Sequence, residues 1–565
     1  MVLRKMQNSI DLRHNGVLSM ELAKRLTEIT KDIRKEYTDY IGDLTKVNGL
    51  TGIDWLISVT CRNPYQTKVF RSLCKLKLLE SCIEKKETIS SVVVENEEMY
   101  HAVSGLSKKH EINLTISILP ISDSYPVLLL FRRLLVSLYI ILISIVVPRL
   151  LVKREKSVPN DPIIFLDTYI KPKDFNVDGG FFDNYYSGLI ENLPEGLSKK
   201  VWYVPVLYSV KSFSDLKWVI EKSRKSNRQF LIMEEWLKIS DYLYSLYISL
   251  KLSRKVKQIP LYGGIDISDL IYRELFLDIF SLSLVRTVLI YRFISRLEGA
   301  GIEIERAVDW NENQLVDRAL NLGLRKFYPA TSVIGYQGYI VSDYYLSHSP
   351  ACYEVVAKTI PDIIFSGCLA VVDHKREFCK TQKVSVAPAF RFQKLLKNRV
   401  DNNIEKEFIL VALPYCVDVA EIIINVCAKW SELQDIKFIV KKHPAISKKV
   451  LFNKVNKLSL DCFEFSDSPL YTLFNSALMM ISSDSSACFE AVACGVHVVI
   501  IGNFTDSTSN PLDGVVASDC WDICYDAACM QNVLEKKSES HVINLTSLLE
   551  PVNEGTVMKF LGYRE

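Results

Sequence analysis

Between residues 406 and 502, short apolar runs alternate with helical patterns, and this alternation limits the possible folds more than any other feature of the sequence. Apolar runs with the length and β-branched content of buried strands lie at 408–414, 436–440, 477–481 and 496–501. Helical patterns lie between them at 418–430 and 487–493. Alternation of this kind predicts an α/β fold built on a parallel sheet.

Two polar clusters follow strands of this region, at the edge of the sheet where open α/β folds bind ligands. They consist of Lys442, His443 and Pro444 after the second run, and Ser482, Ser483, Ser485 and Ser486 after the third. A hydroxyl-rich turn before a helix offers backbone N–H groups and the positive end of the helix dipole to an anion. We therefore expect a phosphate there, with His443 donating to it and Glu490 accepting from a ribose diol. Capping of the helix by Ser485 or Ser486, with Gly495 as its stop, is the simpler interpretation.

The order of these residues resembles the C-terminal, nucleotide-binding half of GT-B glycosyltransferases. The His-Pro and Ser-Ser pairs are similar to those of bacterial sialyltransferases and of related capsule and teichoic acid transferases. The resemblance implies that His443 and the serines hold the nucleotide phosphate of a sugar donor. It also implies that Glu490, which precedes Gly495 in a Glu-x-x-x-x-Gly spacing, holds the ribose.

The composition excludes several classes of protein. The chain has 565 residues, 48% of them hydrophobic, and is long enough for two to four domains with sizeable cores. A formal charge of +3 is too small to indicate a nucleic-acid partner, and no phosphate-loop or dinucleotide-binding glycine motif occurs. Fourteen cysteines without a C-x-x-C pair, and no secretory signal, favour reduced thiols in the cytoplasm. We expect neither a metal site nor a cofactor.

A second strand and helix alternation occupies the N-terminal half. It predicts strands at 55–60, 89–95, 112–119, 163–166, 201–207 and 332–336, and helices at 66–84, 97–108, 183–192 and 315–327. The predicted fold class is α/β and GT-B-like, with two Rossmann-like domains facing each other across a cleft. The expected parts are a helical segment at 1–50, an N-terminal Rossmann-like acceptor domain at 51–125 and 156–392, an apolar insertion at 126–155, a linker at 393–405, and a C-terminal nucleotide-sugar-binding domain at 406–565.

The insertion is the most apolar segment of the chain. Its uninterrupted part, Leu134 to Val147, would form a helix of about 21 Å, shorter than the roughly 30 Å core of a bilayer. Basic residues that suit anionic headgroups flank it at 132, 133, 149, 153 and 154. The sequence therefore predicts a helix at the inner face of a bacterial inner membrane, with a buried core helix as the alternative.

Candidate acceptor-side residues follow strands of the N-terminal half. Asp178 precedes two glycines, which would let a substrate approach the backbone, although turns also use Asp-Gly. It loosely resembles the acidic-Gly motif that carries the general base in some bacterial sialyltransferases, with one acidic residue fewer. Glu312 lies at a strand-to-helix junction, and Gln337 and Gly338 follow the next strand, as expected of a substrate cleft.

This region also resembles bacterial surface-carbohydrate biosynthesis proteins of O-antigen and capsule loci. The segments that carry the resemblance are Glu312-Asn313-Gln314 with Asp317-Arg318-Ala319-Leu320, Gly335-Tyr336-Gln337-Gly338, and the run 361–367. The resemblance implies a role in building a surface glycan.

Together these features predict a transferase that moves a sugar from a nucleotide donor to a surface glycan or lipid-linked glycan. His443, the start of the helix after the serines and Lys442 would stabilise the leaving phosphate without a metal. The reaction can be inverting or retaining. If it inverts, a carboxylate of the N-terminal domain must deprotonate the acceptor, with Glu312 the first candidate and Asp178 the second. A charge that stabilises a helix N-terminus is the alternative interpretation of Glu312. The His-Pro and Ser-Ser pairs favour CMP-Kdo or CMP-sialic acid, while a diphosphate donor stays open. A nucleotide-sugar 2-epimerase and a catalytically inactive assembly scaffold are the alternatives.

Overall fold

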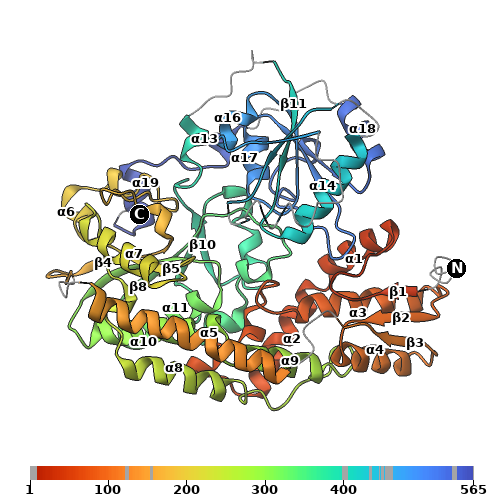
Figure 1. Ribbon diagram of the computed structural model, residues 1–565, viewed down its shortest axis with the longest axis horizontal. Helices are drawn as coiled ribbons and strands as arrows, with labels where there is room; N and C mark the ends of the chain where they lie inside the picture. The colour runs from red at the N-terminus through yellow and green to blue at the C-terminus, as the bar shows by residue number, and fades with distance from the viewer. Residues whose placement is uncertain are drawn as a thin grey trace.

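A computed structural model describes residues 9–120, 126–152, 157–397, 405–431, 436–444, 446, 449, 451, 462–536 and 544–563. The described residues form three all-parallel sheets with helices packed around them (Figure 1). Two of the sheets are large, and they confirm the predicted α/β fold class with two Rossmann-like domains. Much of the predicted linker lies outside the described residues.

The larger N-terminal sheet has seven strands in the order β10-β9-β8-β7-β4-β5-β6. They are β4 (Ile163–Ile170), β5 (Val201–Leu207), β6 (Gln229–Phe230), β7 (Ile304–Trp310), β8 (Ser332–Gln337), β9 (Ile363–Ser366) and β10 (Lys383–Val386). Within this sheet the chain passes from β4 through β5 to β6 at one edge. It then returns to β7, which pairs with β4 on the side opposite β5. The direction of winding therefore reverses between β4 and β7.

The helices of this domain connect and cover these strands. They are α6 (Glu195–Ser198), α7 (Phe213–Lys225), α8 (Ile239–Leu252), α9 (Ser268–Asp278), α10 (Leu282–Glu298), α11 (Leu315–Phe327), α12 (Cys352–Ala357) and α13 (Gln393–Lys397). The amphipathic pattern predicted α11 with the bounds that it has. The predicted helix at 183–192 is wrong, because the Asp183 carboxylate accepts hydrogen bonds from the backbone N–H groups of Tyr185 and Tyr186 and holds a turn there.

The C-terminal sheet has six strands in the order β13-β12-β11-β14-β15-β16. They are β11 (Phe408–Ala412), β12 (Phe438–Lys441), β13 (Phe463–Phe465), β14 (Ala477–Ser482), β15 (His497–Ile501) and β16 (Trp521–Cys524). Its helices are α14 (Val417–Ser431), α16 (Leu470–Phe474), α17 (Ala487–Ala493) and α18 (Ala527–Lys536). Here the winding reverses between β11 and β14, so this domain repeats the organisation of the first.

A third, three-stranded sheet is built from β1 (Ser9–Asp11), β2 (Ser91–Val94) and β3 (Thr115–Ile118). The helices beside it are α1 (Met20–Asp32), α2 (Arg34–Val47), α3 (Val69–Glu84) and α4 (Glu97–Lys109). The sequence predicted that the strands within 51–125 belong to the N-terminal Rossmann-like domain. That prediction is wrong, because β2 and β3 pair in this small sheet and do not enter the seven-stranded sheet.

The strand predicted at 55–60 is also wrong. Two short 3-10 helices replace it, Gly52–Trp55 and Ser58–Cys61. The Asp278 carboxylate accepts the Ser58 backbone N–H at 2.8 Å, and the Thr60 hydroxyl lies within hydrogen-bond distance of the carbonyl oxygens of Trp55 and Ile57. Side-chain bonds to the local backbone thus take the place of a strand ladder.

The C-terminal helix α19 (Glu554–Phe560) packs on the N-terminal domain. The ring of Phe560 contacts those of Tyr336, Phe365 and Phe390, with centroids 5.1–5.8 Å apart. The Tyr563 hydroxyl donates to Glu305 at 2.6 Å. The end of the chain therefore ties the two domains together.

One pair of cysteines departs from the expectation of reduced thiols. Cys524 ends β16 and Cys529 lies in the first turn of α18, and the two form a disulfide with their Cα atoms 5.4 Å apart. The tight turn between strand and helix folds the second cysteine back over the first. The other twelve cysteines are free thiols.

Candidate active site

Both candidate clusters of the C-terminal domain lie at the carboxyl edge of its sheet. Strand β11 pairs with β12 on one side and with β14 on the other. His443, after β12, and the serine turn, after β14, are therefore separated by two strand spacings, about 10 Å. This edge includes the reversal of winding between β11 and β14, which is where doubly wound sheets bind ligands.

The serines are more involved in structure than the sequence predicted. The Ser482 hydroxyl is buried and donates to the Ala412 carbonyl at 2.7 Å. Ser486 is the N-cap of α17, yet its hydroxyl donates to the Ile340 carbonyl in the N-terminal domain at 3.1 Å rather than capping the helix. Ser485 accepts the Ala487 backbone N–H at 3.3 Å, and Ser483 is buried. The prediction of a side-chain cap from Ser485 or Ser486 is thus wrong for Ser486. The serines shape the turn, and Ser486 joins it to the N-terminal domain.

The predicted end of this helix is confirmed. Gly495 has φ +71°, a left-handed conformation that glycine adopts at little cost after a helix. Glu490, on the last turn but one, is half-buried. Burial raises the pKa of its carboxyl, while the positive charges of Arg391 and Lys394 oppose that rise. Both of these cations belong to the segment that leaves the N-terminal domain.

His443 faces positive charges from both domains. Burial lowers the pKa of its imidazole, and the charges of Arg391, Lys171 and Lys442 lower it further. Lys171 follows β4, at the reversal of winding in the N-terminal sheet. Lys442 lies between the end of β12 and His443. The His443 ring also contacts Tyr415 edge to face, with centroids 5.6 Å apart, and Pro444 is exposed in the turn that follows.

Arg391 is the central side chain of this junction, and sequence reasoning did not select it. Its guanidinium lies over the Tyr339 ring, 4.3 Å from the centroid. Its charge acts on His443 and Glu490 in the C-terminal domain and on Glu312 in the N-terminal domain. Its Nε is buried and has no hydrogen-bond partner within the described part of the chain. The only signal in the sequence was an arginine just before the predicted linker.

Glu312 follows β7, on the other side of the N-terminal reversal of winding. Its carboxylate accepts the Trp310 indole N–H at 3.0 Å and the Gln314 side-chain amide at 2.6 Å. Burial raises the pKa of Glu312, and these donors and Arg391 oppose that rise. The backbone N–H groups of Glu312 and Gln314 both donate to the Asp317 carboxylate, which fixes the turn into α11. A carboxylate held in this way, beside a cation, suits a general base.

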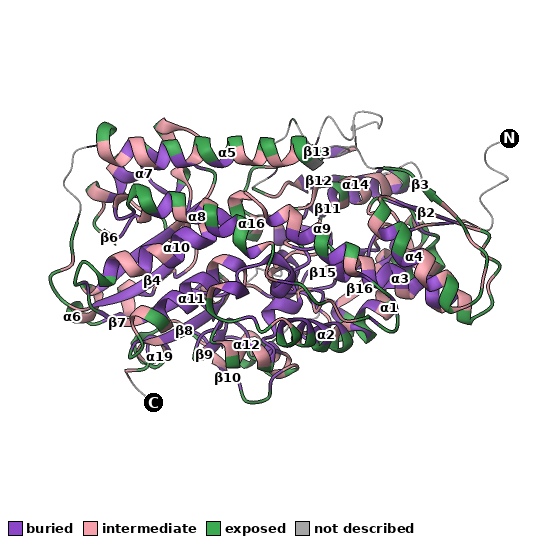
Figure 2. Cartoon of the chain, turned by 90° about the horizontal axis from the view of Figure 1, so that it is seen from below, coloured by how far each residue is buried: buried purple, intermediate pink, exposed green. Residues whose placement is uncertain are grey.

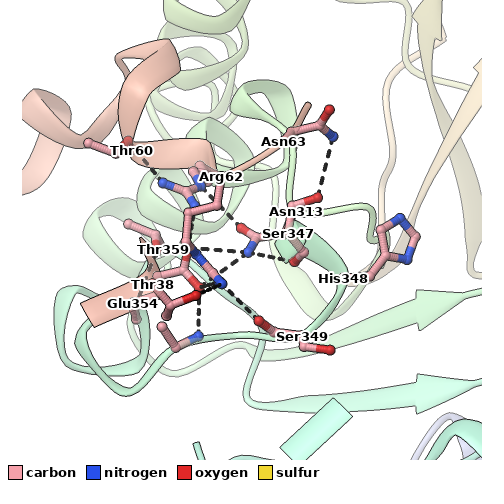
Figure 3. Close-up of polar contacts among 12 residues, drawn as sticks. Thr38, Thr60, Arg62, Asn63, Asn313, Ser347, His348, Ser349, Glu354 and Thr359 are labelled. Carbon is pink, nitrogen blue, oxygen red and sulfur yellow. Dashed lines mark hydrogen bonds and ion pairs between the residues drawn. The ribbon is translucent and has the colours of Figure 1, made fainter. Parts of the chain in front are cut away.

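A buried ionic network supports the turn that carries Glu312, between β7 and α11 (Figure 3). Glu354 forms ion pairs with both Arg62 and Arg318, and all three side chains have 0% exposure. Arg318 also donates to the Asn313 side-chain oxygen at 3.1 Å, and Asn313 donates to the Ser347 carbonyl at 3.0 Å. Asn313 has φ +52°, so these bonds fix a left-handed residue directly after Glu312. The Glu312-Asn313-Gln314 and Asp317-Arg318 segments thus have a structural explanation.

The N-terminal reversal also buries a group of three carboxylates, Asp167, Asp309 and Asp317. One oxygen from each lies within 4.8 Å of the others, a spacing that a cation could bridge, although the sequence predicted no metal ligands. Burial raises the pKa of Asp309 to about 7 and the pKa values of Asp167 and Asp317 well above their usual range. A cavity of about 30 Å³, enough for about two water molecules, borders Asp167 and Asp317.

Three predicted residues do not join this site. Asp178 is exposed, in a loop where the Lys222 amine donates to the Val177 carbonyl and Gly179 packs against Lys225. Those lysines end α7, whose C-terminus lies toward the amino ends of the strands because a crossover helix runs antiparallel to them. Asp178 therefore lies away from His443 and Glu312.

Gln337 and Gly338 lie under the site and do not line it. Gln337 is 2% exposed, and its amide donates to the Asn311 side chain and to the His348 carbonyl. A Cβ on Gly338 would come within 2.4 Å of the Trp310 ring. Gln337 thus holds Asn311, while Gly338 leaves room for the ring of Trp310, the donor to Glu312.

No protein-family model matches the sequence, and no curated protein sequence matches it. The S. aureus MnaA–UDP co-structure shares 12% identity with the chain, with a TM-score of 0.41, and the match covers 71% of this chain and 94% of that one. UDP-GlcNAc 2-epimerase from Neisseria meningitidis bound to UDP-GlcNAc matches at 10% identity and TM-score 0.38, over 70% and 97%. Acinetobacter baumannii MurG matches at 7% identity and TM-score 0.35, over 72% and 96%. These likenesses concern the path of the chain alone.

Proposed function

We propose that this protein is a glycosyltransferase that moves a sugar from a nucleotide donor to a bacterial surface glycan or lipid-linked glycan. One observation supports this most strongly. The cations Lys171 and Arg391 of the N-terminal domain and Lys442 of the C-terminal domain all act on His443, beside the reversal of winding of each sheet. A nucleotide phosphate is the anionic group that doubly wound sheets bind at such positions.

The proposed chemistry divides two tasks among the groups at the junction of the domains. Arg391 would donate to the phosphate through its unpartnered Nε, and neutral His443 would donate a further hydrogen bond. These groups would stabilise the charge that develops on the departing nucleotide, a task that a metal performs in other transferases. Glu312 would accept the proton of the acceptor hydroxyl as that oxygen attacks the anomeric carbon. Glu490 would accept hydrogen bonds from the ribose.

The first hypothesis for the donor is CMP-Kdo or CMP-sialic acid. Three cations around one imidazole suit a diphosphate donor as well.

Thermal unfolding with candidate donors tests the proposal. The purified protein would be heated with a panel of CMP-, UDP- and GDP-sugars. We expect one nucleotide class to raise the melting temperature, by an amount equivalent to about 2.7 kcal/mol at a hundredfold excess over Kd. If no nucleotide raises it, the proposal is wrong.

Product analysis distinguishes the transferase from its rivals. With donor alone, a 2-epimerase would convert the sugar of the donor, whereas a transferase needs an acceptor. With donor and a glycan acceptor, we expect sugar transfer that His443→Ala reduces. An assembly scaffold would show no transfer, and in cells its His443→Ala variant would leave glycan synthesis intact.

A further inference from the structure

Helix α5 (Pro126–Val146) is apolar on its exposed side as well as on its buried side, where Ile141 and Ile143 lie, unlike a surface helix of a water-soluble domain. It continues through a π-helical turn at Val147–Leu151. Among the described residues, 127–151 is the one helix long and apolar enough to cross a membrane, and only 28% of its most apolar window is buried. Its buried residues include Ser137 and Ser144, while its exposed side is formed by large apolar side chains: Val127, Leu128, Phe131, Leu135, Val136, Leu138, Tyr139 and Leu142.

A second apolar stripe lies beside it on α8. Ile239, Leu243, Tyr247 and Leu250 recur at helical spacing and are 39–65% exposed. The Tyr242 hydroxyl donates to the Ser144 carbonyl at 3.4 Å, so the two helices are in contact. Figures 1 and 2 show α5 and α8 along the same side of the molecule, with α5 at its edge and largely uncovered. Soluble monomers rarely expose a continuous apolar area of this extent.

Side-chain bonds hold α5 flat on the domain. Near its middle the Ser137 hydroxyl donates to the Phe280 carbonyl at 3.0 Å. At its end the Arg149 guanidinium donates to the Leu237 carbonyl at 2.6 Å. A helix attached along its length to a folded domain cannot cross a bilayer without carrying α7, α8 and α10 into the hydrocarbon. The same bonds keep the inner side of α5 against the domain, so the outer side of the helix lies along the surface of whatever covers it.

The charges of this face have one sign. The segment 126–151 contains no acidic residue, and the single acid of α8, Asp241, is fully buried between Arg292 and Arg296. Exposed cations flank the apolar stripes at Arg132, Lys238 and Lys251. An apolar centre with a basic border complements the hydrocarbon boundary and the anionic headgroups of a bilayer.

We propose that α5 and α8 together form a docking face for the surface of an anionic lipid bilayer. Both helices lie in the plane of the interface, with their apolar stripes at the acyl boundary and the three cations at the headgroups. The sequence indicated α5 alone, and the structure adds α8 and the orientation. The proposal is independent of which substrate the site takes.

Sedimentation with vesicles tests it. The full chain would be mixed with phosphatidylcholine vesicles that contain or lack phosphatidylglycerol. We expect the protein to bind the anionic vesicles, and the variants Phe131→Ser with Leu135→Ser and Leu243→Ser with Tyr247→Ser each to bind at least about tenfold more weakly. Val356→Ser, on α12 and 82% exposed, is the matched control that should bind like the unchanged protein.

Charge reversal and extraction complete the test. Lys238→Glu and Lys251→Glu should each weaken binding to anionic vesicles by roughly tenfold and leave melting temperatures unchanged, whereas exposed Lys199→Glu should have no effect. Carbonate at high pH should release the protein from native membranes. Retention after carbonate would show a membrane-spanning helix. Equal binding by all variants would show a different docking face. A dimer abolished by Phe131→Ser with Leu135→Ser would show that a second copy of the chain covers these helices. Each of those three results would overturn the proposal.

Discussion

The two reversals of winding differ in charge although their topology is the same. In the C-terminal sheet the reversal is bordered by Lys442, His443 and hydroxyl groups. In the N-terminal sheet it is bordered by Lys171 but also by Glu312 and by the buried carboxylates of Asp167, Asp309 and Asp317. Under the proposed function, one backbone arrangement would supply both an anion-binding side and a proton-accepting side. Arg391 would lie between them.

The two sides also differ in how they are built. The C-terminal groups lie on short turns directly after strands, so strand pairing largely fixes their positions, with one bond from Ser486 to the N-terminal domain. The N-terminal groups depend on distant segments, because Arg62, from the N-terminal helical region, meets Glu354 and Arg318 under the turn that carries Glu312. We therefore expect substitutions on the N-terminal side to affect stability and those on the C-terminal side to affect binding.

The largest effect is expected from Glu312→Gln, which removes the proposed base. It should reduce kcat by roughly 10²- to 10⁴-fold and leave the affinity for the nucleotide donor unchanged. Because burial raises the pKa of Glu312, activity of the unchanged protein should fall with decreasing pH at a higher pH than an ordinary glutamate would cause. Steady-state kinetics across pH measure both quantities. Glu305→Gln, at the opposite end of β7, is the control, and equal activity in the two variants would exclude Glu312 as the base.

The second-largest effect is expected from Glu354→Ala, which tests the buried ionic network under the turn that carries Glu312. Glu354→Ala leaves two buried guanidinium groups without their carboxylate and should lower the free energy of unfolding by about 3–5 kcal/mol. Urea unfolding measures this change. Glu195→Ala removes an exposed carboxylate paired with Lys199 and should leave the unfolding curve essentially unchanged. A similar small change in both variants would show that the network does not hold the domain.

A third prediction concerns Arg391. Its replacement by Ala removes a charged donor and should weaken nucleotide binding by roughly 10- to 100-fold, since hydrogen bonds to charged groups contribute about 1.5–3 kcal/mol. The pKa of His443 should rise, because one of the cations that lowers it is gone. Calorimetry and an NMR titration of the imidazole measure the two changes. Arg376→Ala, whose side chain pairs with exposed Asp373, should change neither. An unchanged His443 pKa would place Arg391 too far away to act.

The smallest effect is expected from Asp309→Asn. The folded-state pKa of about 7 lies above that of the unfolded chain, so the carboxyl favours folding while it is protonated and loses that contribution as pH rises through 7. The variant should therefore be more stable than the unchanged protein above pH 7, with little difference near pH 4. Thermal unfolding at both pH values measures this. A variant less stable at high pH, together with a melting temperature lowered by a chelator, would indicate a bound cation instead.

Most of the strands and helices could be predicted because their patterns are local. The strand Val201–Leu207, the helix Leu315–Phe327 and the strand Phe408–Ala412 all follow from short-range apolar periodicity. The strands of 51–125 were also recognised, but their sheet was not, since pairing partners are not written in local sequence. The apolar run 55–60 failed because Asp278, far along the chain, binds its backbone.

Three of the residues that the sequence selected for the site come together in the structure, and these follow strands or the helix after a strand. His443, Glu490 and Glu312 lie at the junction because topology brings their strand ends together. Arg391 and Lys171 were missed because their importance depends on how the two domains face each other. Asp178 was selected for its glycines, yet its loop packs against the end of α7. Position relative to a reversal of winding was a better guide than local motif.

A structure of the protein with its nucleotide bound tests the central claim most directly. The account predicts phosphate oxygens within hydrogen-bond distance of both the Arg391 guanidinium and the His443 imidazole, and a sugar directed toward Glu312. A nucleotide bound elsewhere, or one whose phosphate contacts neither of those side chains, would contradict it.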